Sequence, residues 1–492
     1  MRGMFRGAAS AACLLLAGAL GAAGAGQARR PPVARPESAQ ALFLLGQTKE
    51  RSRDLTGAAD AYERALQQAP ELAAAHDRLG YVRGQLGDTD AALGHFARAV
   101  ALQPDLFDAQ YHLGATRWWT RDVAGARAPL EAAVRLRPNH AEARYYLGLV
   151  LRQQGDLAPA AAQLRKAVAL APRLAPAHLQ LGVTLQQWGD LDGAVAHLKT
   201  ASSLDPLSID ARNNLGLALM QAGDAEAAVA TLRKLVEDHP DDTTARLNLG
   251  TTLLQKADLS AAADVLNGLL ARDPANALAQ YNLGMALKQQ DRFEDAERAL
   301  GRAIELDATL ADAPFTLGVV LWQTGRLDEA AAAFRQAIGK RKEYADAEYM
   351  LGTVLKQQGA IAEAIAHFQR TVALQPTLAE AYLSLGQALQ QEGRTEEARA
   401  ALDRARALNQ RKADAQASTF AVSVGSRKLK GGDVAGAIAQ YRQAIALAAD
   451  NPQAHYRLAI ALVRRGSRAE AQREYDAARR LAPYLQPPSG LR

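Results

Sequence analysis

The feature that most constrains this chain is a strict 34-residue period. Leu-Gly dipeptides begin at eleven positions from Leu45 to Leu385, and each step between neighbours is 34 residues. An alanine lies twelve residues after each glycine, from Ala58 to Ala398. Self-similarity at a fixed period of this length indicates an array whose units pack only against their neighbours. The length of 492 residues therefore does not translate into a number of globular domains.

Each unit predicts two short helices joined by a tight turn. In residues 345–378, Leu351 lies on one apolar helical stripe, Ala364 and Phe368 lie on a second, and Gly359 separates the two. We number repeat positions from residue 39, which places Leu-Gly at positions 7 and 8. Small residues at positions 8 and 20 leave room where the helices touch, and a proline near position 32 ends the second helix.

Leu-Gly at positions 7 and 8 is followed by alanine at 20, by Tyr, Phe or Leu at 24, by alanine at 27 and often by proline at 32. This pattern resembles the tetratricopeptide repeat family. The resemblance implies an all-α fold, an α-solenoid of helix-turn-helix repeats wound into a right-handed superhelix. It assigns repeats 1–11 to residues 39–412, an insert to 413–417, repeats 12–13 to 418–485 and a tail to 486–492.

The insert and an internal proline are the two irregularities of the array. Residues 409–417 contain no Gly or Pro, so we expect the last helix of repeat 11 to run on, which would rotate the final two repeats. A hinge is the alternative. Pro129 falls inside the second helix of repeat 3 and is expected to kink or delay it.

The N-terminus has the form of a targeting segment. Arg2 and Arg6 precede an apolar run over residues 8–25 that ends in small residues. We expect a signal peptide over 1–25, a disordered leader over 26–38 and an exported protein that is periplasmic or secreted. The alternative is a membrane anchor formed by the uncleaved run.

Charge is unevenly distributed along the chain. Residues 394–492 hold 18 Lys and Arg against 9 Asp and Glu, a net charge of +9. Residues 1–38 carry +4, so the total of +6 leaves −7 for residues 39–393. The basic repeats are either a solvated face or a contact for an anionic surface. After repeat 13 little chain remains, so Tyr475, Leu481, Tyr484 and Leu485 are expected at an uncapped end that favours self-association.

The sequence contains no recognisable catalytic spacing. It lacks His-Glu-x-x-His, Gly-x-Ser-x-Gly and the P-loop, its nine histidines are scattered, and Cys13 is its only cysteine. We therefore expect no enzyme activity, no metal and no cofactor. The modest total charge does not favour a nucleic-acid partner.

The inner surface of the array is the expected binding site. By the family resemblance, positions 2, 5, 6, 9, 12 and 13 of each first helix line it. There, repeats 2–4 carry aromatic side chains, and later repeats carry amides that can hydrogen-bond a peptide backbone. Tryptophans in the core, and glutamines present only as helix formers, are the alternatives. The predicted partner-binding residues are Tyr81, His112, Trp118, Trp119, Tyr146, Arg152, Gln187, Asn214, Gln221, Asn248, Gln255, Asn282 and Gln289.

These features predict an exported, non-enzymatic scaffold that binds an extended peptide or protein partner in its groove. Two alternatives remain at this point. One is an accessory protein for envelope polysaccharide assembly or secretion, in which the amides and aromatic rings grip sugar. The other is a regulatory repeat region that acts with a separate enzyme.

Overall fold

The computed structural model describes residues 37–491, which form 25 α-helices and no β-strand. The predicted signal peptide and all but two residues of the predicted leader lie outside the described residues. Those two are already ordered, because the Ser38 hydroxyl accepts a hydrogen bond from the Ala41 amide at 3.2 Å and caps the first helix. Within the described residues, no helix is both long and apolar enough to cross a membrane.

The helices follow the predicted pairs, with one exception near the C-terminus. The first helices of repeats 1–11 are α1 (Ala39–Arg51), α3 (Ala73–Leu86), α5 (Phe107–Trp119), α7 (Ala141–Gln153), α9 (Ala175–Trp188), α11 (Ile209–Gln221), α13 (Thr243–Gln255), α15 (Ala277–Gln289), α17 (Asp312–Gln323), α19 (Ala345–Gln357) and α21 (Ala379–Gln391). The second helices of repeats 1–10 are α2 (Leu55–Gln68), α4 (Thr89–Leu102), α6 (Val123–Leu136), α8 (Leu157–Leu170), α10 (Leu191–Leu204), α12 (Ala225–Asp238), α14 (Leu259–Leu270), α16 (Phe293–Leu306), α18 (Leu327–Lys340) and α20 (Ile361–Leu374). The last four helices are α22 (Thr395–Lys430), α23 (Val434–Leu447), α24 (Pro452–Arg465) and α25 (Arg468–Leu481).

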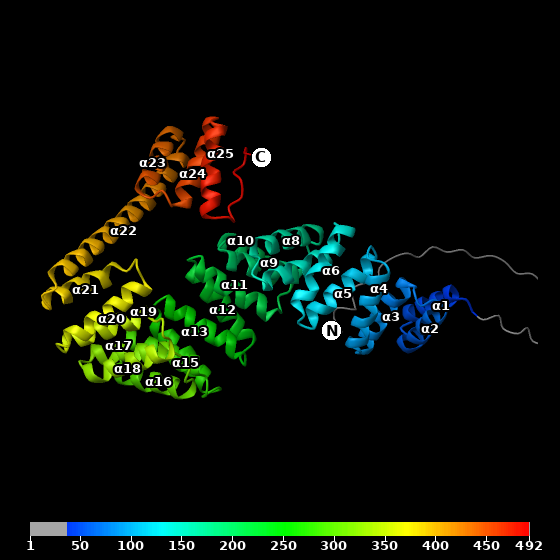
Figure 1. The fold of residues 1–492 in the computed structure, drawn as a ribbon, viewed down its shortest axis with the longest axis horizontal. Helices are drawn as coiled ribbons and strands as arrows, with labels where there is room; N and C mark the ends of the chain where they lie inside the picture. Colours follow the sequence, from blue (N-terminus) through cyan, green and yellow to red (C-terminus); the bar gives the residue numbers. More distant parts are fainter. Residues whose placement is uncertain (1–36, 492) are drawn as a thin grey trace, which may run out of the picture. The chain divides into compact units, whose positions relative to one another are not determined.

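The helices form two compact units, which are described separately. One unit extends to Trp188 and includes Ala196–Pro206, and the other comprises Gly189–Val195 and the chain from Leu207 onward. Each unit is a succession of helix pairs (Figure 1). Within a unit, a second helix such as α4 or α20 packs against the first helix of its own repeat and against that of the next. The predicted all-α solenoid of helix-turn-helix repeats is confirmed.

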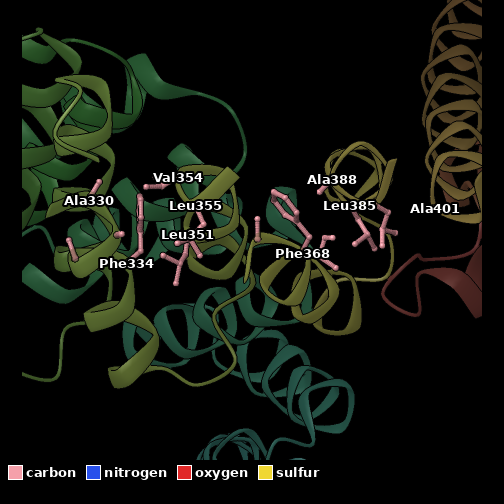
Figure 2. Close-up of a cluster of buried hydrophobic side chains, with 14 of the residues drawn as sticks. Ala330, Phe334, Leu351, Val354, Leu355, Phe368, Leu385, Ala388 and Ala401 are labelled. Carbon is pink, nitrogen blue, oxygen red and sulfur yellow. The ribbon is translucent and has the colours of Figure 1, made fainter. Parts of the chain in front are cut away.

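The core is a row of large side chains at position 24, one in each repeat. These residues are fully buried in repeats 1–10. In repeat 9 the Phe334 ring lies against Gly318, where an added Cβ would stand 2.7 Å from the ring. Glycine is therefore required at Gly318 by this close approach of helix to ring. Figure 2 shows Phe334 and Phe368 alternating with Leu351 and Leu385 through successive repeats.

Pro129 does not delay its helix, contrary to one of the two expected effects. The helix α6 begins at the same repeat position as α4 and has the same length of 14 residues. Proline cannot donate the amide hydrogen bond that the Gly125 carbonyl would receive in a regular helix. The Arg117 guanidinium donates to that carbonyl instead, at 2.9 Å, and so satisfies the acceptor that Pro129 leaves open.

The insert lies inside one continuous helix. The helix α22 has 36 residues and unites the second helix of repeat 11 with the first helix of repeat 12, running through residues 413–417. The expected extension is confirmed, and it goes further than expected because no turn separates the two repeats.

The C-terminal end is covered in part, which corrects the expectation of an uncapped end. Tyr475 is buried, and its hydroxyl donates to the Leu485 carbonyl at 3.0 Å. Leu491 packs against the apolar cluster that contains Leu458 and Leu462 of α24. The tail therefore folds back over the last repeat and leaves Leu481 as the exposed large side chain of α25.

Candidate functional site

The first helices of neighbouring repeats are joined by side chains in a constant register. A residue at position 5 of one repeat hydrogen-bonds a residue at position 6 of the next, across 35 residues of sequence. The pairs are Asp77 with His112 at 2.8 Å, Asn213 with Asn248 at 3.1 Å and Tyr349 with Ser384 at 3.3 Å. Positions 5 and 6 therefore hold the repeats together, in addition to any role that they have in binding.

An aromatic cluster in repeats 3 and 4 brings together three of the predicted residues. The Trp118 ring centroid lies 5.2 Å from that of Trp119 and 5.7 Å from that of Tyr146, both edge to face. The Trp119 indole donates to the Tyr146 hydroxyl at 3.3 Å. Trp119 is 40% exposed whereas Tyr146 is only 8% exposed, within a core cluster formed by α5–α8. Tyr146 is therefore a core residue that orients Trp119, which corrects its assignment to the binding surface.

Two hydrogen-bond donors beside this cluster have no acceptor. The Trp118 Nε1 and the Arg152 Nε are both buried and lie without a hydrogen-bond partner among the described residues. Arg152 also forms no ion pair with any carboxylate in the described part of the chain. Burial lowers the pKa of Arg152, because its charge is removed from water without an opposing charge. Burial likewise raises the pKa of the adjacent Tyr145 to about 12.

A second predicted group surrounds His112. Its Nδ1 pairs with Asp77, which is 2% exposed, and its ring centroid lies 5.4 Å from that of Tyr81. The Arg78 guanidinium stands 4.7 Å from the Tyr81 ring centroid. The structure thus brings Tyr81 and His112 together. His112 is held by a buried carboxylate that sequence reasoning missed, because position 5 is aromatic or aliphatic in most repeats.

The amide side chains predicted to bind a partner fall into two groups, exposed glutamines and asparagines that form hydrogen bonds within the protein. Gln187, in the first unit, and the predicted glutamines of the second unit are exposed at the ends of their helices. The Asn214 amide donates to the Asp210 carbonyl at 2.8 Å, and the Asn282 amide donates to the Thr251 hydroxyl at 2.9 Å. Asn248 donates to the preceding repeat in the same way. Each of the three asparagines therefore uses one of its two amide N–H groups within the protein, which leaves its carbonyl oxygen and its second N–H for a partner.

The structure also pairs histidines that are scattered in sequence. Position 4 of a first helix meets position 23 of the following second helix, 19 residues later. The pairs are His76 with His95 at 3.1 Å, His178 with His197 at 3.1 Å, Glu348 with His367 at 2.5 Å and His455 with Glu474 at 2.6 Å. Across the described residues, no three metal-ligating side chains gather in one place.

The first histidine pair has a defined proton arrangement. His76 Nε2 lies 3.1 Å from the Pro70 carbonyl, which can only accept a hydrogen bond. Nε2 of His76 therefore carries its proton, and Nδ1 of the neutral ring accepts from Nδ1 of His95. A second proton on His76 would occupy the Nδ1 that accepts from His95 and remove this hydrogen bond, so the pair favours a neutral His76.

We expect acid to destabilise the repeats that hold this pair. Burial lowers the pKa of both His76 and His95, below the value of about 6.5 for unfolded histidine. The unfolded chain then binds more protons than the folded chain. The contribution of this pair to the free energy of unfolding is therefore fully present above about pH 6.5 and is lost as the pH drops below that value. Hydrogen exchange in α3 and α4 between about pH 8 and pH 5 measures this loss.

A matched variant supplies the control for this pH dependence. His76→Glu recreates, with His95, the arrangement of Glu348 and His367 at the same two repeat positions. A carboxylate favours the protonated histidine, so the variant is expected to be relatively more stable in acid than the parent chain. Parallel pH profiles for the two proteins would contradict the assignment.

Comparison with known protein families gives matches along most of the repeat array. The tetratricopeptide repeat family matches residues 11–73, 117–175, 247–314, 281–348, 315–379 and 349–418. Further tetratricopeptide repeat matches cover residues 185–251 and 425–466. No curated protein matches the chain.

Several solved structures are similar to parts of the chain. MamA is 29% identical over 34% of this chain and 96% of its own, with a TM-score of 0.32. YrrB, a TPR protein with an unusual peptide-binding site, is 25% identical over 38% of this chain and 96% of its own, with a TM-score of 0.36. A tetratricopeptide repeat protein from Parabacteroides merdae is 16% identical over 51% of this chain and 98% of its own, with a TM-score of 0.43. With the family matched over more than half of its length, and with the helix pairs that the period demands, this chain belongs to the tetratricopeptide repeat family.

Proposed function

We propose that this chain is a non-enzymatic scaffold that binds an extended segment of a partner protein on the first-helix face of repeats 3 and 4. The observation that carries the proposal is the exposed Trp119 ring, fixed in place by Tyr146 and flanked by two donors without acceptors. We further propose export of the scaffold after removal of residues 1–25, on the strength of Arg2, Arg6 and the apolar run that follows them.

An exposed and immobilised tryptophan favours binding for a simple reason. Aromatic side chains bury a large apolar area, and a ring that is already held loses little conformational freedom when a partner covers it. Trp119 meets both conditions, because its indole N–H is fixed by Tyr146 while two fifths of its surface remains exposed. Trp118 supports it from behind as part of the core.

The two buried donors without acceptors, on Trp118 and Arg152, indicate that the partner segment supplies hydrogen-bond acceptors. Buried donors without acceptors cost free energy that a ligand oxygen recovers. Trp118 and Arg152 both stand at position 12 of neighbouring first helices, so an extended backbone that crosses these helices brings carbonyl oxygens to both. In the second unit the asparagine carbonyls act in the opposite sense and accept from backbone amides.

The test uses random linear peptides displayed on phage and selected on the purified chain. Trp119→Ala is expected to weaken the selected peptides about thirtyfold, for a loss of about 2 kcal/mol, while the melting temperature stays nearly constant. Titration calorimetry on the synthetic peptide measures the change. Leu136→Ala is the matched control, since Leu136 is 38% exposed in the same repeat but lies on the second helix.

Two outcomes would contradict the proposal. If Trp119→Ala melts much earlier and binds the peptide unchanged, Trp119 is a packing residue. If no peptide is selected above background, or if Leu136→Ala weakens binding equally, this face is not the binding surface.

A further inference from the structure

The stack of repeats is interrupted at α22, and the exposure of the residue at repeat position 3 shows this interruption. In repeats 2–11 and in repeat 13 this position is alanine, and each of these alanines is at most 1% exposed. Repeat 12 carries Phe420 there, with 66% of its surface exposed. Position 3 is buried wherever a first helix packs against the preceding repeat. The exposure of Phe420 therefore means that repeat 12 has no preceding repeat packed against it.

The opposite side of the interruption is open as well. Leu402 at position 24 of repeat 11 is half-buried, whereas its equivalents in repeats 1–10 are fully buried. Leu383 at position 5 is 42% exposed. Ser423, at position 6 of repeat 12, donates to the Thr419 carbonyl of its own helix at 3.2 Å instead of pairing across the junction. We define the downstream face by Glu380, Leu383 and Leu402, and the upstream face by Phe420 and Arg427.

The continuous helix keeps these two faces apart within one chain. Its N-terminal half buries Ala398 and Ala401 against α21, and its C-terminal half buries Leu429 against α23. Between the last buried residue of the first half, Leu408, and the first of the second half, Ser418, lie about 15 Å of helix. A single copy that retains α22 therefore cannot bring its own two faces into contact.

We propose that a second copy of this chain covers both faces. The downstream face of repeat 11 in one copy packs against the upstream face of repeat 12 in the other, and the reverse contact closes the pair with two-fold symmetry. The downstream face is a repeat without its following first helix, and the upstream face is a first helix without its preceding repeat. The same chain thus carries both halves of the missing contact. The Phe420 ring is too large for the close alanine packing and fills a wider gap against Leu383 and Leu402.

Charge supports a second copy as the occupant. Glu380 of the downstream face lies 3.9 Å from the Lys412 amine of α22 and keeps 56% of its side chain exposed, and Arg427 of the upstream face is exposed without an ion pair among the described residues. Two copies that meet through these faces bring Glu380 of one copy and Arg427 of the other into the same contact. This contact is independent of the proposed peptide site in repeats 3 and 4.

The test measures the molar mass of the purified full chain in solution, by light scattering and by sedimentation, over a range of concentrations. A reversible dimer is expected, and Phe420→Ser is expected to weaken it about tenfold or more, since an aromatic side chain at the centre of a contact dominates its affinity. Leu207→Ser is the control, because Leu207 is 79% exposed outside both faces. The control is expected to leave the dimer unchanged.

Charge reversal supplies a second and independent variant. Glu380→Lys and Arg427→Glu are each expected to weaken the dimer. A chain that stays monomeric at every concentration overturns the proposal. It is equally overturned by a dimer that neither Phe420→Ser nor the charge reversals affect, or by upstream-face binding of anionic vesicles or of a different protein in place of the second copy.

Discussion

Replacing Phe334 with alanine is expected to lower the free energy of unfolding by about 3–5 kcal/mol, with the damage confined to neighbouring repeats. The ring is fully buried between the helices of its own repeat and the first helix of the next, so its removal leaves a cavity in an all-local core. Denaturant unfolding measures the loss. Hydrogen exchange is expected to show it in α17–α20 but not in α3–α6.

The equivalent substitution in repeat 11 is the matched control. Leu402 occupies the same position 24 but is only half-buried, because no first helix covers it. Leu402→Ala is therefore expected to cost roughly half as much as a fully buried leucine at this position, such as Leu300→Ala, at concentrations where the chain is monomeric. Equal costs for the two leucines, or a uniform loss of protection over all repeats after Phe334→Ala, would contradict this account.

The fold was largely predictable because every contact in such an array is local. The residues that set the helix pairs, such as Leu351 and Phe368, recur at fixed positions, and each packs only within its own repeat or against the next. The exceptions depend on contacts that no period encodes. The period does not show that α22 runs without a turn into the first helix of repeat 12, and the tail that carries Leu491 folds back only because an apolar cluster lies beside it.

The sequence predicts which helix face carries the residues of the candidate site, but it does not predict how deeply each of these residues is buried. Repeat position placed Trp118, Trp119 and Tyr146 together, yet it could not show that Tyr146 lies beneath Trp119. Position 6 borders both the inner surface and the neighbouring helix. The surrounding side chains determine whether a ring at position 6, such as that of Tyr146, faces the inner surface or packs against the neighbouring helix. The same holds for Asn248, one of whose two amide N–H groups donates to an asparagine 35 residues away. The histidine pairs escaped notice because a separation of 19 residues is no helical spacing and reflects two helices in contact.

Placing phenylalanine at position 3 of a regular repeat is expected to break the stack at that repeat. Ala347 is fully buried where α19 packs against the preceding repeat, and a ring at this point has no space. We expect Ala347→Phe to cost about 3 kcal/mol or more, at the upper end of the range for overpacked cores. Because coupling in a solenoid passes only between neighbours, one denaturant transition is expected to become two.

Phe420→Ala is the reverse substitution at the same repeat position and serves as its control. The ring is largely exposed in the monomer, so the free energy of unfolding is expected to change by no more than about 0.5 kcal/mol. Together the two variants separate the causes of the interruption at α22. If Ala347→Phe leaves a single transition at an unchanged midpoint, a phenylalanine at position 3 is compatible with stacking, and the five inserted residues alone hold repeats 11 and 12 apart.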